Sequence, residues 1–398
     1  MTASQIRAVP RAARAAVAAL FLTNGALWAN VVPRYPEIKA ELGLSNAVLG
    51  TAIAAFPLGA LLAGLFAAPA IARFRSSRIA ALGIVLLALA TLLIPVAPGW
   101  VALAAVMFVV GALDAVIDVA QNAHGLRVQR LYGRSIVNSF HGVWSIGAVL
   151  GGLMGSAAAG LRVPLLVHLA VSAVLFSAVA VIAYRFLLPG PEDAEREPAA
   201  GAPVARRRLG GTALRLLAAL GVLAACGSLV EDAGASWGAI YLRDELAAGA
   251  AVAGLAFVAL QVAMTAGRLL GDRVVDRFGQ RAVVRAGGAL AAAGMGVALA
   301  FPSIGTALAG FALAGLGVAV VVPAAMHAAD ELPGLPAGVG LTVVSWLLRV
   351  GFLLSPPLVG LIADASSLRV GLLSIVLAGL LMIAFAGVLH PRRRPAAV

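Results

Sequence analysis

Polar residues interrupt the hydrophobic pattern of this 398-residue chain only at intervals, and the apolar stretches between them are long. These stretches are rich in Ala, Leu, Val and Gly, and apolar positions do not alternate with polar ones. A helix needs about 20 mostly apolar residues to cross the hydrocarbon core of a bilayer, which is about 30 Å thick. The pattern predicts twelve spans, at 14–33, 46–72, 79–96, 100–123, 135–160, 165–188, 214–242, 251–271, 282–301, 305–329, 339–362 and 369–389.

The composition indicates that a lipid bilayer surrounds the protein. Hydrophobic residues make up 62% of the chain, and the mean hydropathy is +1.01. In lipid, only helices and closed barrels satisfy all backbone hydrogen bonds, and the continuous apolar runs favour helices. The sequence therefore predicts an all-α integral membrane protein. Its single cysteine, Cys226, falls inside a predicted span, so we expect neither a disulfide nor a cysteine-based metal site.

The net charge of +12 admits a nucleic-acid partner, but the distribution of the basic residues indicates another cause. With twelve spans and both termini inside, basic residues concentrate in the cytoplasmic segments, which is the positive-inside rule. The positive net charge is therefore explained by the expected orientation of the protein in the membrane, and we expect no nucleic-acid partner. Only five of the 29 Lys and Arg residues fall in the outer loops: Arg34, Lys39, Arg162, Arg243 and Arg369.

A polar segment divides the spans into two sets of six. Residues 189–213 are rich in Pro, Gly and mixed charge, a composition typical of a flexible linker. The sequence therefore predicts an N-terminal six-helix bundle over 1–188, a cytoplasmic linker over 189–213, and a C-terminal six-helix bundle with a short basic tail over 214–398.

The two sets of spans resemble each other at a constant offset of 204 positions. One match means little in a chain with 45 glycines, but the register holds from the second to the fifth span of each half. Parallel repeats of this kind predict two pseudo-symmetric bundles. The matched positions are Gly50 and Gly254, Arg73-Phe74 and Arg277-Phe278, Pro98 and Pro302, Gly111 and Gly315, and Gly147 and Gly351.

The segment GRLLGDRVVDRFGQR, residues 267–281, joins the eighth and ninth spans. Its Asp-Arg-x-Gly core and the following basic residue resemble the signature cytoplasmic loop of the major facilitator superfamily. The core residues are Asp276, Arg277, Gly279 and Arg281, and Asp272 lies one turn earlier. Glycine suits a tight turn because it lacks a Cβ, and a carboxylate beside a helix N-terminus is favoured by the helix dipole.

The resemblance implies the fold of that superfamily, with twelve transmembrane helices in two pseudo-symmetric six-helix bundles. It also implies a gating role for the loop, in which Asp272 or Asp276 braces the other half near the start of the fifth span, with Arg134 as a partner. The matching loop of the first half has Ala72 where the acid belongs, so the resemblance implies a one-sided latch.

Two further stretches, 111–155 and 231–244, resemble the bacterial YbjJ-like branch of the superfamily, which is related to fucose permease. This resemblance covers nearly the whole chain and implies a multi-pass protein of the bacterial cytoplasmic membrane. Two departures weaken a multidrug-exporter interpretation. Met107 replaces the arginine typical of antiporters, and the run from Gly147 to Gly152 lacks the proline of the antiporter motif.

Ionisable groups inside the apolar spans are costly and therefore indicate function. Asp114 and Asp118 lie one turn apart on one face of the fourth span, with Gln121 on the same face and Asn122 beside it. Such a face is expected to point into a cavity. Either carboxyl group is a candidate proton carrier, since burial and a neighbouring like charge both favour the neutral form of an acid.

Two further charged groups fall within the second half. Glu231, adjacent to Asp232 in the seventh span, is a third candidate for proton coupling. Arg349 lies near the middle of the eleventh span, where it either binds an anionic solute or pairs with Asp114 or Glu231. Trp237 and Tyr241, by contrast, have the spacing of an interfacial aromatic belt.

The remaining candidates are solute-binding residues. Asn24 and Trp28 lie one turn apart in the first span, and an amide beside an indole suits a polar ring or a sugar. Asn122, Arg349 and His327 complete the predicted solute-binding set, with His327 as a gate or relay.

These features predict a secondary active transporter that moves a small polar solute, sugar-like or an organic acid, by proton-coupled alternating access. The chain has no GxxxxGK[ST] sequence, so ATP is not the expected energy source. We expect no catalytic residue, metal ion or cofactor. The expected partners are the solute, protons and the lipid bilayer, and the expected oligomeric state is a monomer.

Two alternatives remain open. A proton-driven exporter of drugs or metabolites would have the same fold. A magnesium-dependent membrane prenyltransferase is more distant: Asp114 and Asp118, like Asp272 and Asp276, form DxxxD pairs of the kind that holds magnesium-bound diphosphate. That enzyme fold leaves the 204-residue repeat unexplained.

Overall fold

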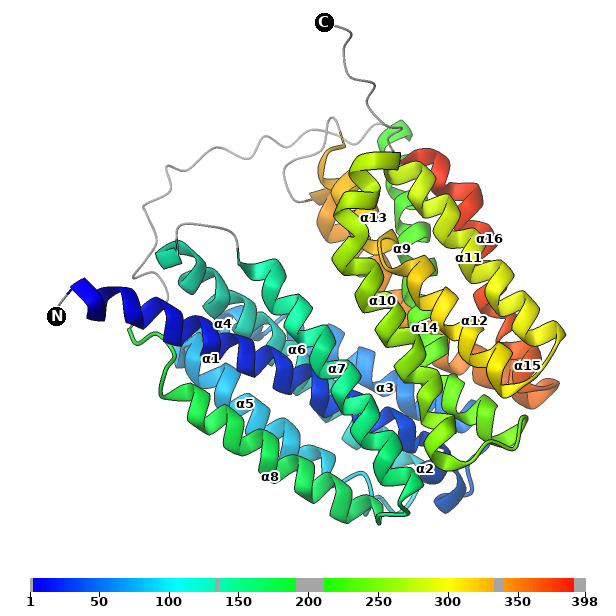
Figure 1. Ribbon diagram of the computed structural model, residues 1–398, viewed down its shortest axis with the longest axis horizontal. Coiled ribbons are helices and arrows are strands. Elements are labelled where there is room, and N and C mark those ends of the chain that lie inside the picture. Colours follow the sequence, from blue (N-terminus) through cyan, green and yellow to red (C-terminus); the bar gives the residue numbers. More distant parts are fainter. Residues whose placement is uncertain (1–2, 133–135, 191–210, 333–338, 390–398) are drawn as a thin grey trace, which may run out of the picture. The chain divides into compact units, whose positions relative to one another are not determined.

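The regular elements of the chain are all helical over residues 3–132, 136–190, 211–332 and 339–389, which the computed structural model describes (Figure 1). Within this part, eleven helical segments are long and apolar enough to cross a membrane, and one bent pair brings the number to twelve if it counts as a span. The predicted all-α membrane fold is therefore confirmed.

In the first half, the elements are α1 (Ala3–Ala29), η1 (Val32–Arg34), α2 (Tyr35–Glu41), α3 (Asn46–Gly64), α4 (Ala67–Phe74), α5 (Ser76–Thr91), α6 (Trp100–Tyr132), α7 (Val137–Gly160) and α8 (Leu165–Tyr184). In the second half, they are α9 (Gly211–Asp244), α10 (Ala250–Phe278), α11 (Gln280–Ala300), α12 (Ile304–Val318), α13 (Val321–Asp330), α14 (Val339–Ala365), α15 (Leu368–Gly371), α16 (Leu373–Phe385) and η2 (Ala386–Val388).

The predicted span 46–72 is wrong at its inner end, because α3 ends at Gly64 and the short α4 follows it. Pro69 lies in the first turn of α4, where its missing N–H costs nothing, whereas it would break a continuous helix. Only two residues of α4, Ala67 and Ile71, are buried, and α4 meets α5 at 112°. The number of apolar residues does not distinguish the short, mostly exposed α4 from the membrane span that precedes it.

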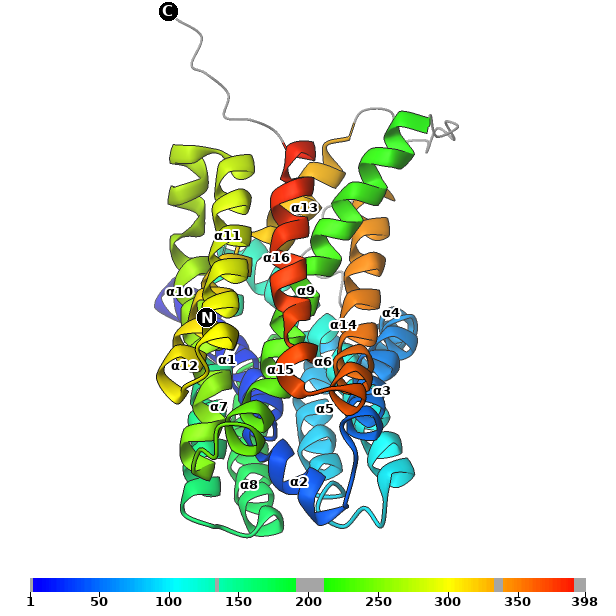
Figure 2. The ribbon, with the colours of Figure 1, turned by 90° about the vertical axis from the view of Figure 1, so that its right-hand side faces the viewer.

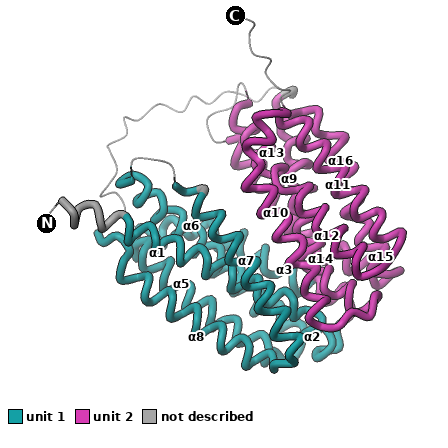
Figure 3. Tube along the Cα trace, in the orientation of Figure 1, with its two compact units in different colours: residues 1–44, 51–199 teal, residues 45–50, 200–398 magenta. Residues whose placement is uncertain are grey.

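The chain forms two compact units, coloured separately in Figure 3. Unit 1 comprises residues 1–44 and 51–199, and unit 2 comprises residues 45–50 and 200–398. The first turn of α3 belongs to unit 2, where Asp364 of α14 accepts the backbone N–H groups of Asn46 and Ala47 at 2.9 and 2.8 Å. The expected boundaries of the linker, 189–213, stay a prediction, since residues 191–210 lie outside the described part.

Inside each unit, the helices pack in corresponding pairs. In unit 1, α1 packs along α7, and α5 packs against both α6 and α8. In unit 2, α9 packs along α14, and α11 packs against both α12 and α16, as Figure 2 shows for α16. Each pair in unit 2 lies about 204 positions after its counterpart in unit 1, as the sequence repeat predicts.

Two details repeat at the same offset. A Cβ at Gly111 of α6 would overlap the carbonyl oxygen of Phe56 on α3, and a Cβ at Gly315 of α12 would overlap that of Leu260 on α10. The two glycines therefore serve the same close helix crossing in each unit. The turns also match, since Arg75 has φ 72° and ψ 144°, and Gly279 has φ 82° and ψ 150°.

Candidate functional site

A hydrogen-bonded chain of three side chains links α7, α1 and α6 within unit 1. Trp144 Nε1 donates to Asn24 Oδ1 at 2.9 Å, and Asn24 Nδ2 donates to Asp114 Oδ1 at 2.8 Å. Asn24 is 3% exposed, while Asp114 and Trp144 are half-buried. A Cβ at Gly25 would overlap the Trp144 carbonyl oxygen, so this glycine brings α1 and α7 close enough for the contact.

Both ends of the Asn24 amide are hydrogen-bonded to other side chains: its oxygen accepts from Trp144 and its nitrogen donates to Asp114. Asn24 was predicted as a solute-binding residue, and that role stays a prediction. Its two hydrogen bonds to protein side chains use one of the two N–H donors of the amide and one of its two acceptor positions. Trp28 is likewise packed, with its ring stacked on Phe56 at 4.2 Å between centroids and edge-on to Tyr35 at 6.2 Å.

A second polar group surrounds Asp118, one turn further along α6. Asn122 Nδ2 donates to the Asp118 carboxylate at 3.0 Å and to its backbone carbonyl at 2.9 Å, and Asn122 Oδ1 lies 3.1 Å from His141 Nε2 on α7. Asp118 and His141 are exposed in unit 1, and Asn122 is half-buried. Gln121, on the same helix, is buried and donates to the Leu20 carbonyl at 3.1 Å.

The adjacent acids of α9 have different surroundings in unit 2. Glu231 forms an ion pair with Arg268 of α10 at 3.3 Å, with the two side chains 22% and 35% exposed. Asp232 accepts from Ser236 Oγ at 3.3 Å, and its Oδ2 is buried without a hydrogen-bond partner among the described residues. Glu231 was one of three predicted candidates for proton coupling, with Asp114 and Asp118. Asp232, beside it, forms no ion pair with the described residues of unit 2.

The aromatic-belt prediction for Trp237 and Tyr241 is wrong, because both side chains are 0% exposed inside unit 2. They lie on α9, which packs against α10, α12, α13, α14 and α16 and is therefore enclosed by its own unit. Helical spacing alone does not distinguish aromatic residues at the membrane interface from aromatic residues on a buried helix face, since both recur about once per turn.

The two remaining solute-binding predictions, Arg349 and His327, lie on α14 and α13. Arg349 is exposed and forms no ion pair with the described residues of unit 2, so within that unit Glu231 is paired with Arg268 and not with Arg349. His327 lies 3.6 Å from Glu331 on the same helix, and both side chains are more than half exposed.

The predicted signature loop forms a tight turn between α10 and α11. Gly279, at φ 82°, separates the two helices, in the left-handed region that favours glycine. Arg281 donates to the carbonyl oxygens of Leu389 and Gly387 at 3.0 and 2.6 Å and so fixes the end of η2.

The other loop residues project from the same turn. The Arg277 guanidinium lies 5.5 Å from the centroid of the Phe278 ring, and Asp272 and Asp276 are exposed. Arg134, the predicted partner of these acids, lies outside the described residues.

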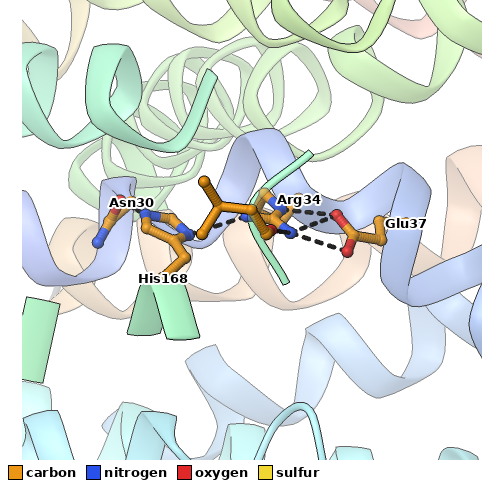
Figure 4. Close-up of polar contacts among 5 residues, drawn as sticks. Asn30, Arg34, Glu37 and His168 are labelled. Atoms are coloured by element: carbon orange, nitrogen blue, oxygen red, sulfur yellow. Dashed lines mark hydrogen bonds and ion pairs between the residues drawn. The ribbon is translucent and has the colours of Figure 1, made fainter. Parts of the chain in front are cut away.

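A buried network that the sequence pattern did not predict lies around Arg34, just after the C-terminal end of α1 (Figure 4). The Arg34 side chain, 1% exposed, donates to both Glu37 carboxylate oxygens at 2.7 and 2.8 Å and to the Val163 carbonyl at 2.8 Å. Its Nη1 lies 3.1 Å from His168 Nδ1, and His168 Nε2 lies 2.6 Å from Asn30 Oδ1.

The donors of this network assign the tautomer of His168. Arg34 can only donate, so His168 Nδ1 accepts and Nε2 carries the hydrogen that it donates to Asn30. Asn30 then donates to Ser172 Oγ at 2.5 Å, and Ser172 donates back to the His168 carbonyl at 2.9 Å. The i, i+3 spacing of Arg34 and Glu37 was visible in the sequence, but His168 is 134 positions away.

The family model of the Major Facilitator Superfamily matches residues 17–231 and 220–398. The chain is 33% identical to the membrane protein MosC of Rhizobium meliloti over 385 residues, which are 95% of this chain and 90% of MosC. Among solved structures, the nucleoside transporter NupG aligns with a TM-score of 0.73 and 16% identity, over 94% of this chain and 98% of NupG. A D-xylose-proton symporter aligns with a TM-score of 0.69 and 15% identity, over 96% of each chain.

Proposed function

Because this chain belongs to the Major Facilitator Superfamily, a family of membrane transporters, we propose that it couples the movement of a small polar solute to protons by alternating access. Asp114 is the proton-carrying acid in this proposal, and Asn24 and Trp144 position it. The arginine distribution supports a cytoplasmic-membrane orientation with both termini inside. Family membership leaves the prenyltransferase alternative without support.

One observation carries the assignment of Asp114. Its carboxyl group lies in the transmembrane helix α6 and is held by a neutral amide, with no ion pair to the described residues of unit 1. An acid inside a membrane span is costly and is retained where it has a function. Since no cation among the described residues of unit 1 holds Asp114 in its charged form, the carboxyl group can take up and release a proton without breaking an ion pair there.

The other candidate acids fit a proton carrier less well. Glu231 would have to leave Arg268 in order to bind a proton, because the two form an ion pair at 3.3 Å. Asp118 is exposed and hydrogen-bonded to Asn122 at the next turn of α6. Asp232, with one buried carboxylate oxygen unpartnered, is the acid of unit 2 that most resembles Asp114, and we assign it a secondary role in proton coupling.

The solute class in this proposal is polar and hydroxyl- or carboxylate-bearing. NupG is named as a nucleoside transporter, and the D-xylose symporter is named as proton-coupled; both names support a polar solute. Arg349 suits an anionic or hydroxylated group, because its guanidinium is exposed and has no ion-pair partner among the described residues of unit 2. His327 and Asn122 remain candidate solute contacts, and Trp28 is a packing residue in this proposal.

Proteoliposomes test the assignment. The purified protein is screened for uptake driven by a pH gradient across sugars, nucleosides and organic acids, and the transported solute is then used with Asp114→Asn. We expect this variant to lose pH-driven accumulation and to keep exchange of external for internal solute, since exchange needs no net proton movement. The matched control is Asp330→Asn, which removes an exposed acid from the end of α13.

Two results would contradict the assignment: full pH-driven accumulation by Asp114→Asn, or equal loss in Asp330→Asn. A finer variant, Trp144→Phe, keeps an aromatic side chain but replaces the indole with a smaller phenyl ring, which removes the Nε1–H donor to Asn24. We expect it to fold normally and to change the pH at which uptake is half-maximal, because Asn24 is then free to turn away from Asp114. An unchanged pH profile would remove Trp144 from the proposal.

A further inference from the structure

Asp232 on α9 is an acid with oxygen atoms around it but no cationic side chain paired with it in unit 2. Its Oδ2 atom is buried and has no hydrogen-bond partner among the described residues of that unit. The nearby cation Arg268 is paired with the adjacent Glu231 at 3.3 Å. Burying a carboxylate without a partner is costly, so Asp232 requires either a proton or a bound cation.

Three further oxygen atoms lie near this carboxyl group. Ser236 Oγ, one turn further along α9, donates to Asp232 Oδ1 at 3.3 Å. Ser355 Oγ of α14 donates to the Leu229 carbonyl oxygen at 3.4 Å and lies beside the Asp232 carboxyl group. Ser236 and Ser355 are 4% and 0% exposed, so unit 2 itself encloses both hydroxyl groups.

The spacing of these oxygen atoms suits a bound cation better than a hydrogen-bonded cluster. Hydrogen bonds from hydroxyl groups to oxygen are usually about 2.7–2.8 Å long, whereas the two here are 3.3 and 3.4 Å. Around a cation with oxygen ligands at about 2.4 Å, neighbouring ligands of an octahedral shell are about 3.4 Å apart. The two observed separations match the edges of such a shell.

Two prolines interrupt the backbone hydrogen bonds of α14 at this level. Pro356 and Pro357 directly follow Ser355 inside the helix. A proline has no N–H to donate to the carbonyl four residues before it, so the carbonyl groups of Phe352 and Leu353 lack their usual helical donors. Interrupted helices supply carbonyl oxygens of this kind to cations in membrane transporters. The α14 backbone therefore has spare acceptors within one turn of Ser355.

The ligand set favours a small monovalent cation. All the donor atoms are oxygens, which hard cations prefer, and the one carboxylate supplies a single negative charge. Glu231 adds no net charge because it is paired with Arg268. A divalent cation would leave a net positive charge buried in unit 2, whereas a monovalent one is neutralised. The oxygen spacing suits Na⁺, which is about as large as Ca²⁺, and is short for the larger K⁺.

From this arrangement we infer that unit 2 binds one Na⁺ ion at Asp232. The ligands are the Asp232 carboxylate, the Ser236 and Ser355 hydroxyl groups and the Leu229 carbonyl oxygen, with the spare carbonyl groups of α14 available to complete the shell. The site goes beyond the proposed function, because it involves neither Asp114 nor the solute. Na⁺ and the proton exclude each other at the Asp232 carboxylate, since one oxygen cannot hold both.

Equilibrium binding of radioactive Na⁺ to the purified protein tests the site without any solute. The measurement is made in detergent at one alkaline pH, with choline chloride keeping the ionic strength constant. We expect one Na⁺ per protein, displaced by unlabelled NaCl and not by KCl at the same concentration. Asp232→Asn keeps the side-chain shape and removes the charge, so it should lose binding. Ser355→Ala keeps the charge and removes one ligand, so its affinity should fall about ten-fold.

Two matched controls remove the same groups from exposed positions of the same region. Asp244→Asn changes the last residue of α9, and Ser366→Ala changes the residue directly after α14. Both variants should bind Na⁺ with the native affinity. Circular dichroism establishes that each variant keeps the native helical signal, and if Asp232→Asn does not fold, Ser355→Ala decides the test.

Three outcomes would overturn the inference. They are the absence of saturable Na⁺ binding by the native protein, in which case Asp232 takes up only a proton, native affinity in Asp232→Asn or Ser355→Ala, and an equal loss in the two controls. Failure of the proposed function is seen separately, because Asp114→Asn should leave Na⁺ binding unchanged whatever it does to pH-driven accumulation.

Discussion

Replacement of Glu37 by glutamine should strongly destabilise unit 1, because it leaves a buried arginine without its counter-charge. Arg34 is 1% exposed, and Glu37 accepts two of its hydrogen bonds, at 2.7 and 2.8 Å. Glutamine keeps the shape and one acceptor oxygen but removes the negative charge. The guanidinium then retains Val163 and His168 as partners, and both are neutral.

The size of the effect follows from burial and charge. Breaking a buried ion pair by removing one partner costs about 3–5 kcal/mol, and a hydrogen bond to a charged group contributes about 1.5–3 kcal/mol. Glu37 itself is 27% exposed, so water solvates part of what remains. We therefore expect a loss of about 2–3 kcal/mol in the free energy of unfolding, toward the lower end of these ranges.

Thermal unfolding in one fixed detergent, followed by circular dichroism of the helical signal, measures this loss. A unit of this size shifts its midpoint by about 2–4 °C per kcal/mol, so Glu37→Gln should unfold about 4–12 °C below the native protein. The control is Glu41→Gln, which removes the same charge from an exposed position of the same helix, α2. Its midpoint should stay within a degree or two of the native value, roughly the scatter expected for surface substitutions.

A double-mutant cycle tests whether the Arg34–Glu37 ion pair stabilises unit 1. In Arg34→Met with Glu37→Gln, the unpaired charge is absent, so the double variant should lose at least about 1 kcal/mol less than the sum of the two single variants. Strictly additive losses, or a Glu37→Gln midpoint equal to that of Glu41→Gln, would show that the ion pair does not stabilise unit 1.

Two further predictions concern the repeated features of the two units, and the same thermal assay measures both. Gly111→Ala and Gly315→Ala should each destabilise the protein by about 1–3 kcal/mol, because the added Cβ overlaps a carbonyl oxygen of the neighbouring helix. Gly296→Ala is the control and should not destabilise it, because no atom lies within 4 Å of the added Cβ. Equal stability of all three variants would contradict the role of the two glycines in the helix crossings. Arg75→Gly should stabilise the protein by about 1 kcal/mol, because φ 72° with ψ 144° is a strained conformation for a residue with a Cβ. Gly279→Ala should destabilise it for the same reason. The opposite signs would contradict the assignment of the two turns.

The membrane fold was predictable because the hydropathy of each helix follows from its own residues and does not depend on its neighbours. A run of about 20 apolar residues is long enough to cross the bilayer whichever helices pack beside it. The arginine distribution predicts, by the positive-inside rule, which ends of the helices are cytoplasmic. The 204-residue offset paired Gly111 with Gly315, and the structure shows that both glycines serve the same helix crossing. The matching turns at Arg75 and Gly279 were found only in the structure. The surface helix α4 was missed, since its composition is as apolar as a span.

The partners of the polar side chains were not predictable, because they depend on which helix faces meet. Asn24 is 90 positions from Asp114 and 120 from Trp144, and nothing in the local pattern of α1 names either residue. Glu231 was predicted as a candidate for proton coupling and as one of two possible partners of Arg349, whereas the packing of α9 on α10 pairs it with Arg268. Trp237 was expected at the membrane interface and is enclosed by its own unit.

The sequence by itself determined the helical membrane architecture, the internal repeat and the family, because each follows from residue types at regular spacing along one segment. Tertiary structure alone decided that Arg34 is buried with His168 and Glu37, that Asn24 is hydrogen-bonded to Asp114, and that glycines of α10, α11 and α12 line a hollow. Hydropathy is a property of one helix in contact with its solvent. A hydrogen-bond partner or a hollow is a property of several helices in contact with one another, so only the packed chain specifies it.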